Sequence, residues 1–294
     1  MEYSFQVDSE IVKKAFADLP NFKIEIGGGK TTVNQCVIYF TGNSLYFPND
    51  EKAFRYSVLE HDYYEWKNLK FPNVKKHIFV RDIFKQWYLG GINSQLDSAE
   101  KVAEFLRKET EGMEVITVGS SAGGYAAILF GDMLGAKRVY AFSPRIEMMS
   151  LFDTPPTRTP LVHRLKDTDR RKYMDLGTLL NFKDTDVYCF CPTDSSMDII
   201  QYARMNETGL INNPKLHLLR FNTSKHGVPF PKVALPYIFR LPESKLKALF
   251  STDKVVNPMM FSVKMAGVFR TVAGVSKQLY HGYIKKKFAR LFSK

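Results

Sequence analysis

The sequence has few cysteines, no long apolar run and no acidic residue near its C-terminus, and each absence excludes a class of protein. Its 294 residues include three cysteines, Cys36, Cys189 and Cys191, all in apolar strand-like runs. An odd number in such runs indicates reduced core thiols of a cytoplasmic protein and disfavours a disulfide framework. No apolar run reaches the length of a membrane span. The first ten residues lack the features of a signal peptide, so we expect a cytoplasmic protein.

Charge is distributed unevenly along the chain. The net charge is +12, yet the segment from Lys254 to Lys294 holds nine Lys or Arg and no acid, which leaves 33 basic and 30 acidic groups before it. Apolar residues between these cations predict a basic amphipathic extension over 251–294 that fits an anionic membrane surface, such as the inner membrane face. An anionic polymer fits as well. Nucleic acid is disfavoured because no nucleic-acid module is evident elsewhere, and a helix packed on the domain is the remaining alternative.

The most informative motif lies at residues 119–123, Gly-Ser-Ser-Ala-Gly. A β-branched run at 115–118 predicts a buried strand before it, and a small-residue segment at 125–130 predicts a helix after it. G-x-S-x-G in this setting predicts a nucleophile elbow, in which Ser121 occupies a strained turn with glycine two residues to either side. The hydroxyl would then lie at a helix N-terminus, where negative charge is favoured. An ordinary Gly/Ser-rich turn is the alternative.

An earlier strand end supplies candidate oxyanion donors. Residues 35–40 predict a strand that ends in Thr41-Gly42-Asn43. By position, the N–H of Gly42 or Asn43 would join that of Ala122 to hold an oxyanion. The alternative is an ordinary β-turn.

Two later strand ends supply a candidate acid and base. The strand predicted at 186–191 is followed by Asp194 and Asp198 and then by a helix. Asp194 matches the usual spacing better; Asp198 is the alternative, or else a first-turn acid favoured by the helix dipole. His226 follows the final strand, which gives the order Ser, Asp, His. His61 has no metal-ligand partner at a useful spacing, and we expect no metal.

Residues 33–230 resemble the α/β-hydrolase superfamily, with Ser121, Asp194 or Asp198, and His226 matching its nucleophile, acid and base. The resemblance implies a mostly parallel central sheet with helices on both faces, within a catalytic domain of residues 1–250. We expect a small cap-like insertion at about 150–182 after the sixth strand, and the extension at 251–294. At the N-terminus, alternation predicts a first strand at 3–7, and residues 27–31 predict a hairpin turn.

The segment GSSAGGYAA, with Asp198 and Gln201 at a later helix start, is similar to bacterial capsule and surface-polysaccharide O-acetyltransferases of this fold. This similarity implies serine-dependent acetylation of a capsular or surface polysaccharide, with acetyl-CoA as co-substrate and no bound cofactor. A carboxylesterase or deacetylase with the same triad is one alternative. A non-catalytic scaffold of a polysaccharide or secretion assembly is another. The sequence leaves the acyl group, the acceptor and the oligomeric state open.

Overall fold

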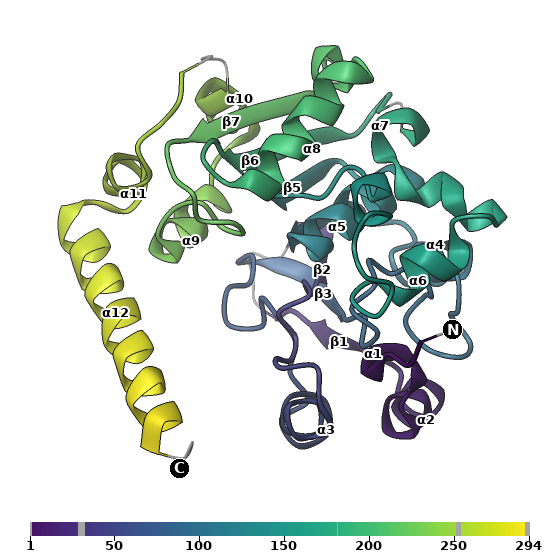
Figure 1. Ribbon diagram of the computed structural model, residues 1–294. Helices are drawn as coiled ribbons and strands as arrows, with labels where there is room; N and C mark the ends of the chain where they lie inside the picture. The colour runs from purple at the N-terminus through teal and green to yellow at the C-terminus, as the bar shows by residue number, and fades with distance from the viewer. Residues whose placement is uncertain (1, 29–32, 181, 251–253, 292–294) are drawn as a thin grey trace.

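The computed structural model describes residues 2–28, 33–180, 182–250 and 254–291, which form a seven-stranded sheet with helices on both faces (Figure 1). The strands are β1 (Phe22–Ile26), β2 (Val33–Phe40), β3 (Val74–Val80), β4 (Glu114–Ser120), β5 (Arg138–Phe142), β6 (Asp186–Pro192) and β7 (Leu216–Phe221). The α-helices are α1 (Phe5–Asp8), α2 (Glu10–Asp18), α3 (Glu51–Phe54), α4 (Ala99–Glu109), α5 (Ala122–Met133), α6 (Pro160–Leu165), α7 (Leu176–Leu179), α8 (Ser196–Glu207), α9 (Leu235–Ile238), α10 (Glu243–Phe250), α11 (Pro258–Ala266) and α12 (Val268–Leu291).

The sheet order brings the predicted strand ends together. The strands lie in the order β1-β3-β2-β4-β5-β6-β7, and β1 is antiparallel to β3 while the other neighbours are parallel. Carboxyl ends of parallel strands share one edge, so the loops after β2, β4, β6 and β7 meet there. The predicted mostly parallel sheet is confirmed.

Alternate residues of the parallel strands face two separate cores. On β2, Cys36, Ile38 and Phe40 pack into the core that includes α4 and α5. Val37 and Tyr39 pack into the opposite core, which includes α9 and α10. Burial on both faces explains why these strands are apolar at nearly every position. All three cysteines are buried free thiols, as predicted, and burial raises the pKa of Cys36 to about 12.

The N-terminal segment differs from the prediction. Residues 3–7, predicted as a strand, enter α1 instead, and the Asp8 carboxylate accepts the Ser4 N–H at 2.8 Å. That local contact favours a helix start over an extended chain. Gly29, Lys30 and Thr31 of the predicted hairpin turn lie outside the described residues. The flanking strands β1 and β2 do not pair with each other, because β3 lies between them, so the hairpin prediction is wrong.

The insertion, the segment between β5 and β6, follows the fifth strand and not the sixth as predicted. The count changes because residues 3–7, the first predicted strand, do not form a strand. The insertion carries α6 and α7 with two short 3₁₀ turns, Met149–Leu151 and Asp169–Met174.

The C-terminal segment first returns to the sheet and then leaves it. Val256 forms a bridge beside Phe221 of β7, and the Phe261 ring of α11 packs on the ring of Phe221 at 5.1 Å. Thr271, in the first turn of α12, is buried. Beyond it, α12 extends along one side of the molecule (Figure 1). In the described part of the chain, no helix is both long and apolar enough to cross a membrane. A boundary at residue 250 stays a prediction.

Candidate active site

Ser121 lies on a strained turn between β4 and α5. Its backbone has φ 57° and ψ −117°, a region that residues with a side chain rarely adopt. A Cβ on Gly119 would lie 1.9 Å from the Gly123 carbonyl oxygen, and one on Gly123 would lie 2.2 Å from the Phe40 oxygen. Only glycine is compatible with such approaches. The strand–turn–helix geometry predicted for the elbow is therefore present.

His226 joins the serine to a carboxylate. The Nε2 atom of His226 lies 2.8 Å from the Ser121 hydroxyl oxygen, and its Nδ1 atom lies 2.7 Å from an Asp198 carboxylate oxygen. Asp198 is 4% exposed, in the first turn of α8. A proton held on Nδ1 by Asp198 leaves the Nε2 lone pair to accept the serine proton. His226 and Asp198 can therefore activate the Ser121 hydroxyl.

Asp194 does not join this chain of hydrogen bonds, which corrects the sequence preference for it over Asp198. Asp194 is exposed in the loop after β6, where its carboxylate accepts the Thr193 hydroxyl at 2.9 Å. The Asp194 N–H donates to the Thr223 carbonyl oxygen at 3.1 Å. Because α8 begins at Ser196, the residue that turns toward His226 comes from the first helical turn and not from the strand end.

The mostly parallel sheet and the strand–turn–helix elbow at Ser121 together define the fold. The chain has the α/β-hydrolase fold.

The two candidate oxyanion donors in the loop after β2 differ in their partners. The Gly42 N–H donates to a Glu65 carboxylate oxygen at 2.9 Å, so it is already engaged. Asn43 lines the pocket beside Ser121, and within the described residues its N–H meets no protein acceptor. The Ala122 N–H is at the start of α5, where backbone donors have no partner inside the helix. The structure thus leaves Ala122 and Asn43 as the available pair and corrects the candidacy of Gly42.

Glu65 is a member of the site that sequence reasoning missed. Its N–H donates to the Thr41 hydroxyl at 3.2 Å, so Glu65 binds both residues before Asn43. Burial raises the pKa of the Glu65 carboxyl, and the hydrogen bond from Gly42 acts in the opposite direction. Nothing in the irregular aromatic segment around Glu65 predicts this contact.

A second loop, after β3, is also held by a buried carboxylate. Asp82 accepts N–H groups of Phe84, Gln86 and Tyr88 at 2.7 to 2.9 Å. These bonds accommodate positive φ values at Lys85, Trp87 and Tyr88, of 56°, 54° and 60°. Burial raises the pKa of Asp82 to about 6, although the hydrogen bonds lower it. The loop places Lys85 and Trp87 in the pocket wall.

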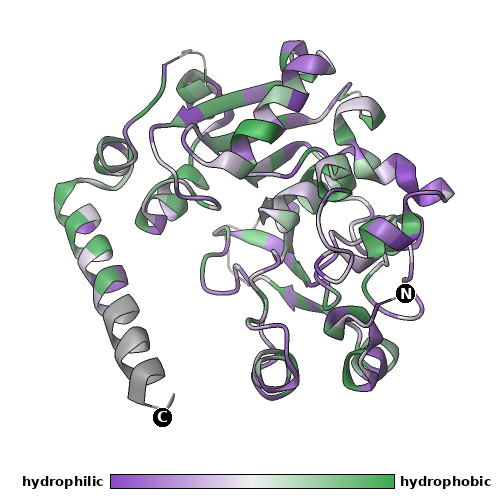
Figure 2. Ribbon diagram, viewed as in Figure 1, coloured by the Kyte–Doolittle hydropathy of each residue, from purple (hydrophilic) through white to green (hydrophobic). Residues whose placement is uncertain are grey.

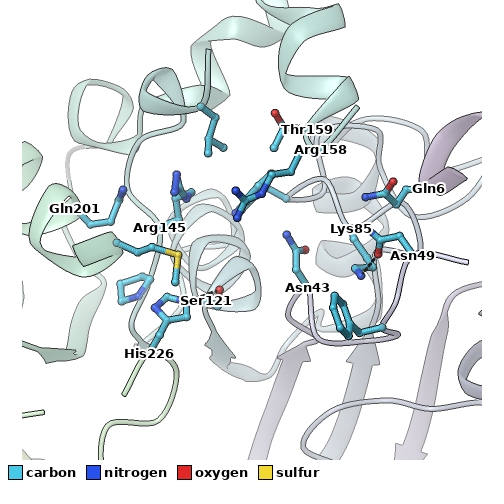
Figure 3. A pocket seen from close by; sticks show the side chains of 15 residues that line it. Gln6, Asn43, Asn49, Lys85, Ser121, Arg145, Arg158, Thr159, Gln201 and His226 are labelled. Carbon is cyan, nitrogen blue, oxygen red and sulfur yellow. Dashed lines mark hydrogen bonds between the residues drawn. The ribbon is translucent and has the colours of Figure 1, made fainter. Parts of the chain in front are cut away.

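The pocket around Ser121 has a volume of about 280 Å³, and its lining combines basic and polar side chains with apolar ones. Three cations border it, Lys85, Arg145 and Arg158, and none of the lining residues is Asp or Glu (Figure 3). Lys85 donates to the Tyr46 carbonyl and the Asn49 side chain, each at 2.6 Å. Burial lowers the pKa of Lys85 to about 8, and burial also lowers that of Arg145. Arg158 comes from the insertion.

The insertion is fastened to α8, the helix that carries Asp198. The Gln201 side-chain oxygen accepts the N–H of Ile146 at 2.6 Å and that of Glu147 at 2.9 Å. Gln201 lies one turn after Asp198 on α8, on the same side of the helix. Its buried amide therefore sets the position of Arg145, the residue before Ile146, relative to Asp198.

No protein-family model and no curated protein sequence matches the chain. Solved structures are similar to it at low identity. The capsule O-acetyltransferase of Neisseria meningitidis serogroup A is 14% identical over 69% of this chain and 83% of its own, with a TM-score of 0.48. A variant of that enzyme has been solved in complex with CoA.

Two further likenesses are equally remote. Acetyl xylan esterase 1 of Thermoanaerobacterium sp. is 12% identical over 68% of this chain and 70% of its own, with a TM-score of 0.40. A puromycin-hydrolysing peptidase of Mycobacterium tuberculosis is 11% identical over 80% and 38%, with a TM-score of 0.49. At these distances we infer function from the residues of this chain.

Proposed function

We propose that this protein is a serine-dependent O-acyltransferase with Ser121 as nucleophile, His226 as general base and Asp198 as the triad acid. The observation that carries the proposal is the unbroken path from Ser121 Oγ to His226 Nε2 at 2.8 Å and from His226 Nδ1 to Asp198 at 2.7 Å. A serine hydroxyl is a weak nucleophile until a neighbouring base takes its proton.

The reaction would proceed in two steps. Ser121 Oγ attacks the acyl carbonyl while its proton moves to His226 Nε2, and the N–H groups of Ala122 and Asn43 stabilise the oxyanion. Collapse expels the leaving group, which takes the proton from His226, and leaves an acyl ester on Ser121. In the second step His226 deprotonates an acceptor hydroxyl, which attacks the ester carbonyl; collapse transfers the acyl group to the acceptor, and Ser121 Oγ leaves with the proton from His226.

We propose acetyl-CoA as the donor and a hydroxyl of a bacterial capsular or surface polysaccharide as the acceptor. Side-chain amides and a hydroxyl in the pocket lining, from Gln6, Asn43 and Thr159, support an acceptor rich in hydroxyl groups. The net charge of +12 suits the phosphates of CoA.

A carboxylesterase is the competing outcome, and one observation favours it. The His226 side chain is 30% exposed, so water can approach the base at the acyl-enzyme stage. Hydrolysis and transfer then differ only in whether His226 deprotonates water or a hydroxyl of the acceptor.

The test is the intact-protein mass after brief incubation with acetyl-CoA, for wild type and Ser121→Ala. We expect an acetyl adduct on the wild type alone. Turnover of a simple aryl acetate, lost by about 10⁴-fold or more in the variant, without an adduct from acetyl-CoA would favour the esterase. No adduct and no turnover in either protein would contradict an acyl-transfer role and favour the scaffold.

We also propose that the C-terminal segment binds an anionic membrane surface. Several apolar side chains of α12 are exposed and fall within about 120° around its axis, at about 100° per residue: Val268, Phe269, Val272, Leu279 and Tyr280. Arg270 and Lys277 lie on another side of the helix, at about 180 to 200° on the same scale. The absence of acids from Lys254 onward supports an anionic partner.

A further inference from the structure

Two guanidinium groups meet in the pocket beside Ser121. Arg145 follows β5, and Arg158 belongs to the insertion. Figure 3 shows the two side chains in the same pocket, with Ser121 and His226 below them in the view. Two like charges repel each other, and an anion bound between them offsets that repulsion.

Neither arginine of this pair forms a direct ion pair with a described carboxylate. Glu147 and Asp198 attract Arg145 at longer range, while both carboxylates accept hydrogen bonds from other groups. Glu147 accepts the N–H and the hydroxyl of Ser150, and Asp198 binds His226.

Arg145 is held so that its donors stay available. The guanidinium lies 5.5 Å from the centre of the Trp87 ring, and its one hydrogen bond within the described residues is a long one of 3.4 Å to the Glu147 carbonyl. Stacking on an aromatic ring fixes the plane of a guanidinium while leaving its N–H groups free for a carboxylate or phosphate.

The phosphates of acetyl-CoA do not account for this pair. When the thioester carbonyl is at Ser121, the extended pantetheine arm separates the phosphates from it, whereas both arginines line the same small pocket as Ser121. The group that binds the two arginines therefore belongs to the acyl acceptor, whose hydroxyl lies next to the acyl-serine.

We propose that Arg145 and Arg158 form a subsite for an oxyanion of the acyl acceptor, so that the acceptor is an acidic sugar bearing a carboxylate or a phosphate. This inference rests on the proposed acyl-transfer function. Guanidinium groups bind such oxyanions in a bidentate manner, which would orient the sugar with one hydroxyl at Ser121.

The experiment compares acetyl transfer from acetyl-CoA to galacturonate, galactose 6-phosphate and galactose, for wild type, Arg158→Met and Arg171→Met. Arg171 is an exposed arginine of the same insertion that does not line the pocket, so it is the matched control. We expect wild type and Arg171→Met to prefer an anionic sugar over galactose. Arg158→Met should lower that preference by about 10- to 100-fold, as expected when a charged hydrogen bond is lost. Preference for galacturonate or for galactose 6-phosphate identifies the oxyanion.

Equal rates of acetyl transfer from wild type to galactose and to both anionic sugars would overturn the subsite. An Arg158→Met variant that keeps the wild-type preference for an anionic sugar would overturn it too. If Ser121 takes no acetyl group, the proposed function fails, and the subsite is tested separately by calorimetric binding of the three sugars. Anion binding that depends on Arg158 would then support the subsite without turnover. No binding of either anionic sugar to wild type would overturn it.

Discussion

The helix α5 begins at the proposed nucleophile, and α12 carries the face proposed to bind a membrane. The two helices are built in opposite ways. Ten of the twelve residues of α5 are buried, and two of them are the glycines Gly123 and Gly124 at its start. In α12, Phe269 is 92% exposed and Leu279 is 70% exposed. Function at α5 depends on the position of single atoms, whereas function at α12 depends on the character of a face. Substitutions should therefore act locally and strongly at α5, and additively at α12.

The largest effect is expected at Asp198 of α8, which His226 connects to Ser121 at the start of α5. Asp198→Asn keeps the size of the side chain but cannot hold His226 in the required tautomer, so we expect turnover of an aryl acetate to fall by about 10⁴-fold. Asp194→Asn is the matched control, and it should retain activity within about 2-fold. Initial rates of both variants at one pH are the measurement. Equal losses in the two variants would contradict Asp198 as the acid.

Gly123→Ala tests how tightly the start of α5 is constrained. The added Cβ would lie 2.2 Å from the Phe40 carbonyl oxygen, so backbone must shift at the elbow. We expect the free energy of unfolding to fall by about 1–3 kcal/mol and turnover to fall by about 10²-fold. Gly28→Ala, where no heavy atom lies within 4 Å of the new Cβ, is the control. Denaturant unfolding and initial rates measure the two effects, and a stable, active Gly123→Ala would refute the constraint.

The smallest effect on catalysis is expected at α12. The double variant Phe269→Asp, Leu279→Asp places two acids on the exposed apolar face, so binding to liposomes containing anionic lipid should fall by about 10-fold or more. Its turnover of a soluble aryl acetate should stay within about 2-fold of the wild type. Tyr3→Asp with Ile26→Asp, at exposed apolar residues outside this helix, is the control for co-sedimentation. Undiminished lipid binding in the α12 variant would contradict the membrane proposal.

The sequence predicts those parts of the site that depend on local rules. Gly119 and Gly123 are required by the backbone at Ser121, so the elbow is visible as a motif, and His226 follows from the order of the strands. Spacing from the end of β6 favours Asp194 over Asp198, whereas the start of α8 at Ser196 decides which of the two carboxylates turns toward His226.

Contacts between distant segments were beyond prediction. Glu65 captures the Gly42 N–H from 23 residues away, and no pattern marks it. Residues 3–7 alternate like a strand, but five residues are too few to separate the two periods, and the contact from Asp8 to Ser4 favours a helix. The basic pocket combines Lys85, Arg145 and Arg158 from three segments, so only the folded chain shows it.

The amide of Gln201 has a consequence for how this fold can change over time. It binds the backbone of residues 146 and 147 to the helix that carries Asp198, so the start of the insertion is held in place. Beyond that start the insertion can lengthen, shorten or exchange residues such as Arg158 without moving Asp198. If the proposed acyl transfer is correct, new acceptor preferences can arise by substitutions in the insertion while Ser121, His226 and Asp198 stay in place.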